Sequence, residues 1–115
     1  MKIRREQMQA INDERVLAKM QELLCEHGPP SASELDSREL RAKIQRGMRG
    51  AGSHGISELY DVYRFVEWQL RLGEGFGESN AWAAEILAFE AFDGTEKMNR
   101  IDYHAQHVLG LVAEG

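Results

Sequence analysis

Apolar residues recur at helical spacing along most of the chain, and their pattern predicts helices from the first residues onward. From Ile3 to about His27 they fall at steps of three to five residues, which places them on one side of an α-helix. Gly28 suits the left-handed position after a helix, and the pair Pro29-Pro30 cannot continue its hydrogen bonds. The first helix is therefore expected to end at Gly28 and to be followed by a loop.

The second predicted helix begins with the clearest boundary signal in the chain. Asp36 can cap the free amide groups, and Glu39 three residues later can complete a capping box. Leu35 can pack on Leu40 as a hydrophobic staple. This helix is expected to fray through its glycines and to end by Gly55.

Three further helices are predicted in the second half of the chain. We expect Ser57 to cap the third helix and a glycine-rich loop around Phe76 to close it. Ser79 or Asn80 is expected to cap the fourth helix, which an Asp-Gly pair ends, and Thr95 to cap the fifth. Nowhere do apolar and polar residues alternate between turn signals as they would in a strand.

The sequence therefore predicts an all-α fold, a bundle of about five helices with short loops in a single domain over residues 1–115. The expected core consists of Ile11, Met20, Leu24, Leu40, Ile44, Val62, Val66, Leu70, Trp82, Ile86 and Ile101. The fifth helix also carries an apolar stripe in alternating steps of three and four, which permits a homodimer. That stripe comprises Met98, Ile101, Ala105, Val108 and Val112.

Composition narrows the classes of partner. Apolar residues make up 43% and charged residues 29% of the chain, as in a folded protein rather than a disordered one. No apolar run approaches the ~20 residues of a membrane-crossing helix, so no membrane partner is expected. The net charge of -5 argues against nucleic acid, whose phosphates it would repel. With one cysteine, Cys25, and no secretory signal in view, we expect a cytoplasmic protein.

Histidine supplies the only candidate metal ligands. His104 and His107 stand three residues apart on the fifth helix, and His54 could join them. A catalytic zinc site needs a third protein ligand, and the HExxH motif is absent. We therefore expect no metal, no cofactor and no catalytic residue, with a metal-dependent enzyme built on these histidines as an alternative.

The second helix presents the one local basic patch of the chain. Its apolar residues Leu40, Ile44 and Met48 recur at steps of four and form one narrow face. The arginines around them therefore occupy the outer face. Arg41, Arg46 and Arg49 are the residues expected to steer an acidic protein partner.

Large apolar side chains are concentrated between residues 65 and 92, and we do not expect a domain of this size to bury all of them. Those left exposed would form a protein-binding patch. Trp68, Phe76 and Phe92 are the residues expected at that surface.

Residues spread along most of the chain carry a resemblance to a known group of proteins. They are Ile3 to Gln7, Leu40-Arg41 with Ile44 and Gly47, Gly55-Ile56, Asp61-Val62 with Arg64-Phe65-Val66, Leu72-Gly73 with Phe76, and Trp82-Ala83 with Ile86-Leu87. In this order they resemble small helical accessory proteins of proteobacteria that tend to be encoded beside type VI secretion spike and effector genes. The resemblance implies an accessory role and no catalytic residues.

These observations lead to an expected function of binding rather than catalysis. We expect a non-catalytic adaptor or co-chaperone that binds a type VI secretion effector or its chaperone. The alternative is an immunity protein that neutralises a cognate toxin by direct binding, with its acidic surface over the toxin's active site.

Overall fold

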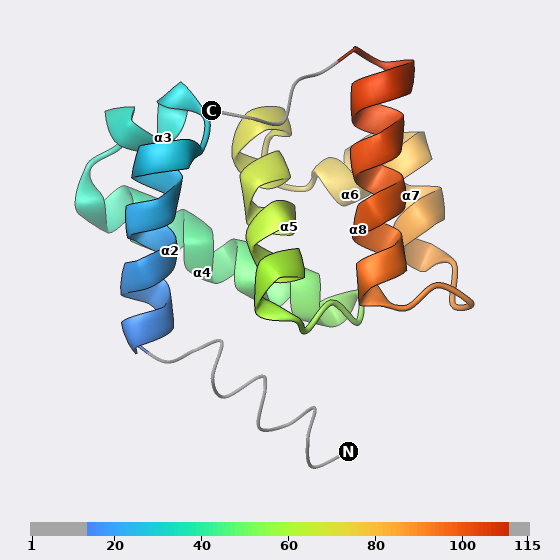
Figure 1. Ribbon diagram of the computed structural model, residues 1–115, viewed down its shortest axis with the longest axis horizontal. Coiled ribbons are helices and arrows are strands. Elements are labelled where there is room, and N and C mark those ends of the chain that lie inside the picture. The colour runs from blue at the N-terminus through green and yellow to red at the C-terminus, as the bar shows by residue number, and fades with distance from the viewer. Residues whose placement is uncertain (1–13, 111–115) are drawn as a thin grey trace.

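The computed structural model describes residues 14–110, which are helical over most of that range (Figure 1). The elements are α2 (Glu14–His27), α3 (Pro30–Glu34), α4 (Ser37–Ser53), α5 (Leu59–Leu72), α6 (Phe76–Ser79), α7 (Ala81–Ala88), α8 (Gly94–Tyr103) and the π-helical turn η1 (His104–Val108). Residues 14–110 contain no strand. The predicted all-α fold class is confirmed.

Helix α5 occupies the middle of the bundle. Figure 1 shows α2, α3 and the start of α4 on one side of it and α6, α7 and α8 on the other. Helix α5 packs on α4 and α8 and also touches α3 and α6, whereas α7 packs on α6 and α8. The second half of the chain is therefore held to the first largely through α5.

Most of the predicted core is buried. The confirmed positions are Met20, Leu24, Leu40, Ile44, Val62, Val66 and Ile101. Leu70, Trp82 and Ile86 are only partly buried and pack against the edge of this core. Ile11 lies outside the described residues.

Two helix starts were predicted from their capping residues. The Asp36 carboxylate accepts a hydrogen bond from the Glu39 amide at 2.9 Å, so this cap is confirmed. Asn80 precedes α7 as expected, but its side-chain amide donates to the Phe76 carbonyl rather than capping the helix.

Two other caps were predicted wrongly. Asp93, not Thr95, caps α8 by accepting from the Glu96 amide at 2.8 Å. The Thr95 hydroxyl is instead turned toward α5. Glu58 rather than Ser57 precedes α5, and no side chain caps that helix.

Short helices form where loops were expected. Helix α3 begins at Pro30, because a proline at the first helical position lacks only an amide hydrogen that would be unpaired there anyway. Helix α6 follows Gly75, whose φ of 80° is strained for other residues. Helix α4 does not fray at Gly47, where an added Cβ would lie 2.8 Å from Val66 Cγ2. Gly47 thus permits the close approach of α4 to α5.

The apolar stripe of the fifth helix is only partly confirmed. Met98, Ile101 and Ala105 are buried, but Val108 is 60% exposed, and Val112 lies outside the described residues. The reason is η1, in which a π-turn holds more residues than an α-turn and rotates the following side chains away from the stripe. The buried part of this apolar stripe therefore ends at Ala105.

A polar network joins α5 to α8, and we call it the α5–α8 network: Asp61, Arg64, Trp68, Thr95 and Asp102. Arg64 donates to the Asp61 carboxylate at 2.6 Å and to the Asp102 carboxylate at 2.8 Å. The Trp68 indole donates to the second Asp102 oxygen at 2.6 Å, and the Thr95 hydroxyl donates to the second Asp61 oxygen at 2.5 Å. Each carboxylate thus accepts one bond from Arg64 and one from a neutral group.

The network holds one cation between two carboxylates inside the bundle. Asp61 is 3% exposed and Arg64 is largely buried. Burial works to lower the pKa of the Arg64 guanidinium, but the hydrogen bonds and charges of Asp61 and Asp102 outweigh it and raise the pKa above its ordinary value. The two carboxylates therefore favour the charged form of the guanidinium.

The beginning of α8 also sits against the end of α4. The residue Lys97 is 8% exposed, and its ammonium donates to the His54 carbonyl at 2.7 Å. A Cβ added at Gly94 would lie 2.8 Å from both the Gly55 carbonyl oxygen and Ile56 Cα. Backbone thus packs on backbone at this junction, with no flexible side chain to yield.

We expect Asp61→Ala to lower the free energy of unfolding by about 3 kcal/mol, because it leaves Arg64 with one carboxylate and Thr95 without its acceptor. Urea denaturation measures the loss. Glu96→Ala, which breaks an exposed pair with Arg100, is the control and should cost about 0.5 kcal/mol. Equal losses from the two variants would contradict the importance of the network.

Adding Arg64→Met to Asp61→Ala should recover part of that loss, because the guanidinium is no longer buried with one carboxylate missing. Asp102 loses its cation too, but its side chain is 24% exposed and keeps the Trp68 donor. A double variant whose loss equals the sum of the two single losses would show that the residues are not coupled.

Gly94→Ala is expected to lower the free energy of unfolding by about 2 kcal/mol, since overpacking here must move backbone. The matched control is Gly50→Ala, where the new Cβ would meet only the ring edge of Phe65 at 3.3 Å and alanine favours the helix. Thermal denaturation compares them. A Gly94→Ala protein as stable as the control would contradict the tight junction.

Candidate functional site

The expected exposure of Trp68 and Phe76 is wrong. Each side chain is 1% exposed. Trp68 belongs to the α5–α8 network, and the Phe76 ring packs on Phe65 with centroids 5.1 Å apart. The reason is the central place of α5, which is covered from two sides and so buries more aromatic surface than a peripheral helix could. Neither side chain can meet a partner at the surface of this fold.

The three arginines predicted to steer a partner lie on α4, and two of them are already paired. Arg46 donates twice to Glu74, at 2.9 and 2.8 Å, and Arg41 forms an ion pair with Glu14. The hydrogen bond from Arg46 lowers the pKa of Glu74 below its ordinary value. Arg49 is exposed. Much of the predicted basic face is therefore neutralised within the chain.

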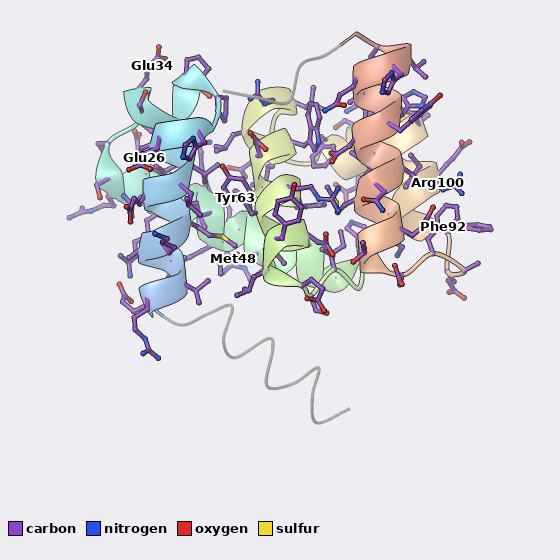
Figure 2. The ribbon with its side chains drawn as sticks, viewed as in Figure 1. Glu26, Glu34, Met48, Tyr63, Phe92 and Arg100 are labelled. Atoms are coloured by element: carbon purple, nitrogen blue, oxygen red, sulfur yellow. The ribbon has the colours of Figure 1, made fainter. Side chains whose placement is uncertain are left out.

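Phe92, the third predicted aromatic, lies at the surface on the other side of the bundle. It is half-buried in the segment that joins α7 to α8 (Figure 2). Helix α7 was expected to continue to Asp93 but ends at Ala88, so Phe89 and Phe92 lie beyond the helix. Their rings meet edge to face with centroids 4.5 Å apart.

These two phenylalanines form one end of an open groove between α7 and α8, which we call the α7–α8 groove. Its volume is about 630 Å³. It is lined by Glu85, Ile86, Phe89, Phe92, Glu96, Asn99, Arg100, Tyr103, His104 and Val108. Of the apolar side chains, Phe89 is 51%, Tyr103 is 64% and Val108 is 60% exposed. This concentration of exposed large apolar side chains makes the groove the candidate functional site.

Arg100 is held in place along one wall of the groove. Its guanidinium lies 4.5 Å from the ring centroid of Phe92, and its Nε donates to the Glu96 carboxylate at 2.7 Å. Figure 2 shows Phe92 and Arg100 beside each other at the edge of the molecule formed by α8. The ion pair and the cation–π contact together limit the rotamers of Arg100 before any partner binds.

Aromatic pairs also order the other end of the groove. The rings of Trp82 and His104 stack with centroids 4.6 Å apart and planes 9° from parallel, which joins α7 to η1. Tyr103 and His107 pack at 4.6 Å. The π-turn leaves Val108 and Leu109 exposed at this end.

The histidines of the alternative metal site are not brought together. His54 ends α4, where its ring packs on Phe65 and lies 3.9 Å from the Glu78 carboxylate. His104 and His107 belong to η1 at the far end of α8. Within residues 14–110, no three His, Cys, Asp or Glu side chains gather closely enough to hold a metal ion.

Sequence reasoning missed Tyr103, Phe89 and Val108 as surface residues. Val108 was predicted to continue the apolar stripe of the fifth helix. Phe89 lies within the span predicted for the fourth helix, where it fits a regular helical repeat with Trp82 and Ile86. Phe89 is displaced because α7 ends before it, and Val108 because η1 shifts the repeat. The sequence did carry a signal that Tyr103 is exposed, because this residue lies off the apolar stripe predicted for the fifth helix.

Comparison of the chain with family models, curated proteins and solved structures finds no match. The resemblance to type VI secretion accessory proteins therefore stays a prediction. Among residues 14–110, no helix is long and apolar enough to span a membrane.

His54 is expected to make stability depend on pH. Burial lowers its pKa, and Lys97 adds to this while Glu78 opposes it. The folded state thus favours the neutral ring, so stability is complete above the ordinary pKa of about 6.5 and falls as pH drops through the lower folded value.

His54→Gln should therefore lose less stability than the wild type between about pH 7.5 and 5.5, as measured by urea denaturation. The exposed His107, changed to Gln, is the control and should leave the wild-type slope unaltered. A His54→Gln protein with the wild-type slope would contradict this assignment.

Proposed function

We propose that this protein is a non-catalytic adaptor or co-chaperone that binds another protein through the α7–α8 groove. The observation that carries the proposal is the group of exposed apolar side chains, Phe89, Tyr103 and Val108, along one groove of about 630 Å³. Soluble proteins rarely leave such residues together unless they meet a partner. The groove replaces the predicted surface of Trp68 and Phe76, and it retains Phe92.

The residue types of the groove favour protein recognition. Tyrosine and arginine are enriched among the residues that contribute most to protein interfaces, and Tyr103 and Arg100 lie on the same wall. Arg100 is already positioned by Glu96 and Phe92, so binding would cost little side-chain entropy there. Phe89 offers an apolar surface that a partner could bury.

The resemblance to type VI secretion accessory proteins supplies the class of partner in this proposal. The partner would be a secretion effector or its chaperone, held in the cytoplasm before loading. The binding surface would be the same for either of them.

The second candidate function is that of an immunity protein, and the net charge of -5 favours it. Such a protein covers the active site of a toxin with acidic residues. Deletion of the gene separates the two functions, because cells that lose an immunity protein are killed by the toxin, whereas cells that lose an adaptor fail to deliver the effector.

Phe89→Ser should weaken binding of the co-purifying secretion protein by about 30-fold, the effect of losing a large aromatic side chain that a partner buries. Tyr60→Ser is the matched control, because Tyr60 is 70% exposed on α5 and lies outside the groove. Quantitative co-purification from the native host, followed by titration of the purified pair, measures both variants.

Circular dichroism should show both variants folded, since each replaces an exposed ring. Failure to enrich any secretion protein, or equal binding by the wild type and Phe89→Ser, would count against the proposal.

A further inference from the structure

We infer that the α7–α8 groove binds a basic amphipathic helix of its partner. The inference rests on the proposed function and adds the chemistry of the segment that is bound. It follows from the charges that surround the groove and from the shape of its walls.

Two carboxylates, one in the lining of the groove and one beside it, are unpaired among residues 14–110. Glu85 lines the groove from α7, and Glu90 follows Phe89 in the connecting segment, and both are exposed. Among residues 14–110, no basic side chain lies within ion-pair distance of either one. Their charge is therefore available to a ligand.

The other charged groups nearby are already engaged. Glu96 pairs with Arg100, so together they add no net charge to the wall. Asp93 caps α8, and the Lys97 ammonium is buried against the His54 carbonyl rather than facing the groove. The charge that is left uncompensated is negative, and it favours lysine or arginine on a bound segment.

Among residues 14–110, the lining of the groove contains one guanidinium and no ammonium. It belongs to Arg100, whose Nε is bonded to Glu96. The His104 ring lies flat on Trp82, and the His107 ring packs on Tyr103. The basic surface predicted on α4 lies outside the lining, and its Arg46 is paired with Glu74.

The shape of the groove favours a helix as the bound segment. Its walls are two packed helices, α7 on one side and α8 with η1 on the other, and its apolar side chains run from Phe89 to Val108. A helix laid along such a groove presents residues at positions i, i+3 or i+4 and i+7 to the apolar strip. Basic residues at its sides would then face Glu85 and Glu90.

Two synthetic helical peptides of about 15 residues test the inference. Both carry leucine and phenylalanine at the same positions, and the polar face is lysine in one and glutamate in the other. Fluorescence anisotropy of the labelled peptides against the whole protein measures affinity. We expect the lysine peptide to bind at least about tenfold more tightly at low salt, with the difference shrinking as salt is raised.

Charge reversal at the groove supplies the decisive variant. Glu85→Lys with Glu90→Lys should abolish or invert the preference for the lysine peptide. The matched control reverses Glu26 and Glu34, two exposed acids on α2 and α3, far from Phe92 in Figure 2, and changes the net charge equally. If the control shifts the preference as much as the groove variant does, overall charge explains it and the inference is overturned.

The remaining outcomes separate the inference from the proposed function. Equal binding of both peptides, weakened in each case by Phe89→Ser, would overturn the inference and leave the groove as a protein-binding site. Binding of neither peptide would overturn the inference, and unchanged partner binding by Phe89→Ser would then remove the proposed function as well. A dimer that Phe89→Ser dissociates would assign the groove to a second copy of this chain and overturn the inference.

Discussion

The position of α8 depends on one buried cation. Arg64 projects from α5 and is held between Asp61 on its own helix and Asp102 on α8, while Thr95 and Trp68 fill the remaining carboxylate oxygens. Loss of either carboxylate would leave this buried charge short of a partner, and the bond from Arg64 to Asp102 ties α8 to α5 at a definite register. The α7–α8 groove inherits its geometry from that register, because α7 packs mainly on α6 and α8.

Tertiary packing and the end of α7 decide which aromatic side chains are left for a partner. The Trp68 indole donates a hydrogen bond to Asp102, and the Phe76 ring packs on Phe65. Phe89 and Phe92 escape burial because α7 ends before them and the connecting segment turns them outward. The excess of apolar side chains expected from the sequence is real, but the exposed members that line the groove lie on the connecting segment, α8 and η1, not at Trp68 and Phe76.

Local signals predicted local features well. The Asp36 cap and the apolar face of α4 follow from side chains a few residues apart, whose contacts are formed within one helix. The prediction of the residue that caps α8 was wrong because of a contact between two helices. Asp93 and Thr95 are both good capping residues, and the choice between them depended on a carboxylate of α5 that takes the threonine hydroxyl.

The sequence by itself determined the helical class, most helix positions, much of the core and the absence of any recognisable catalytic motif, because these depend on periodicity and on neighbours along the chain. Only the tertiary structure decided that Trp68 and Phe76 are buried, that Arg46 is paired with Glu74, and that Phe92 shares a groove with Tyr103 and Val108. The physical reason is that exposure and charge compensation are set by residues distant in the chain. Asp61 and Asp102 meet Arg64 only after α5 and α8 have packed together.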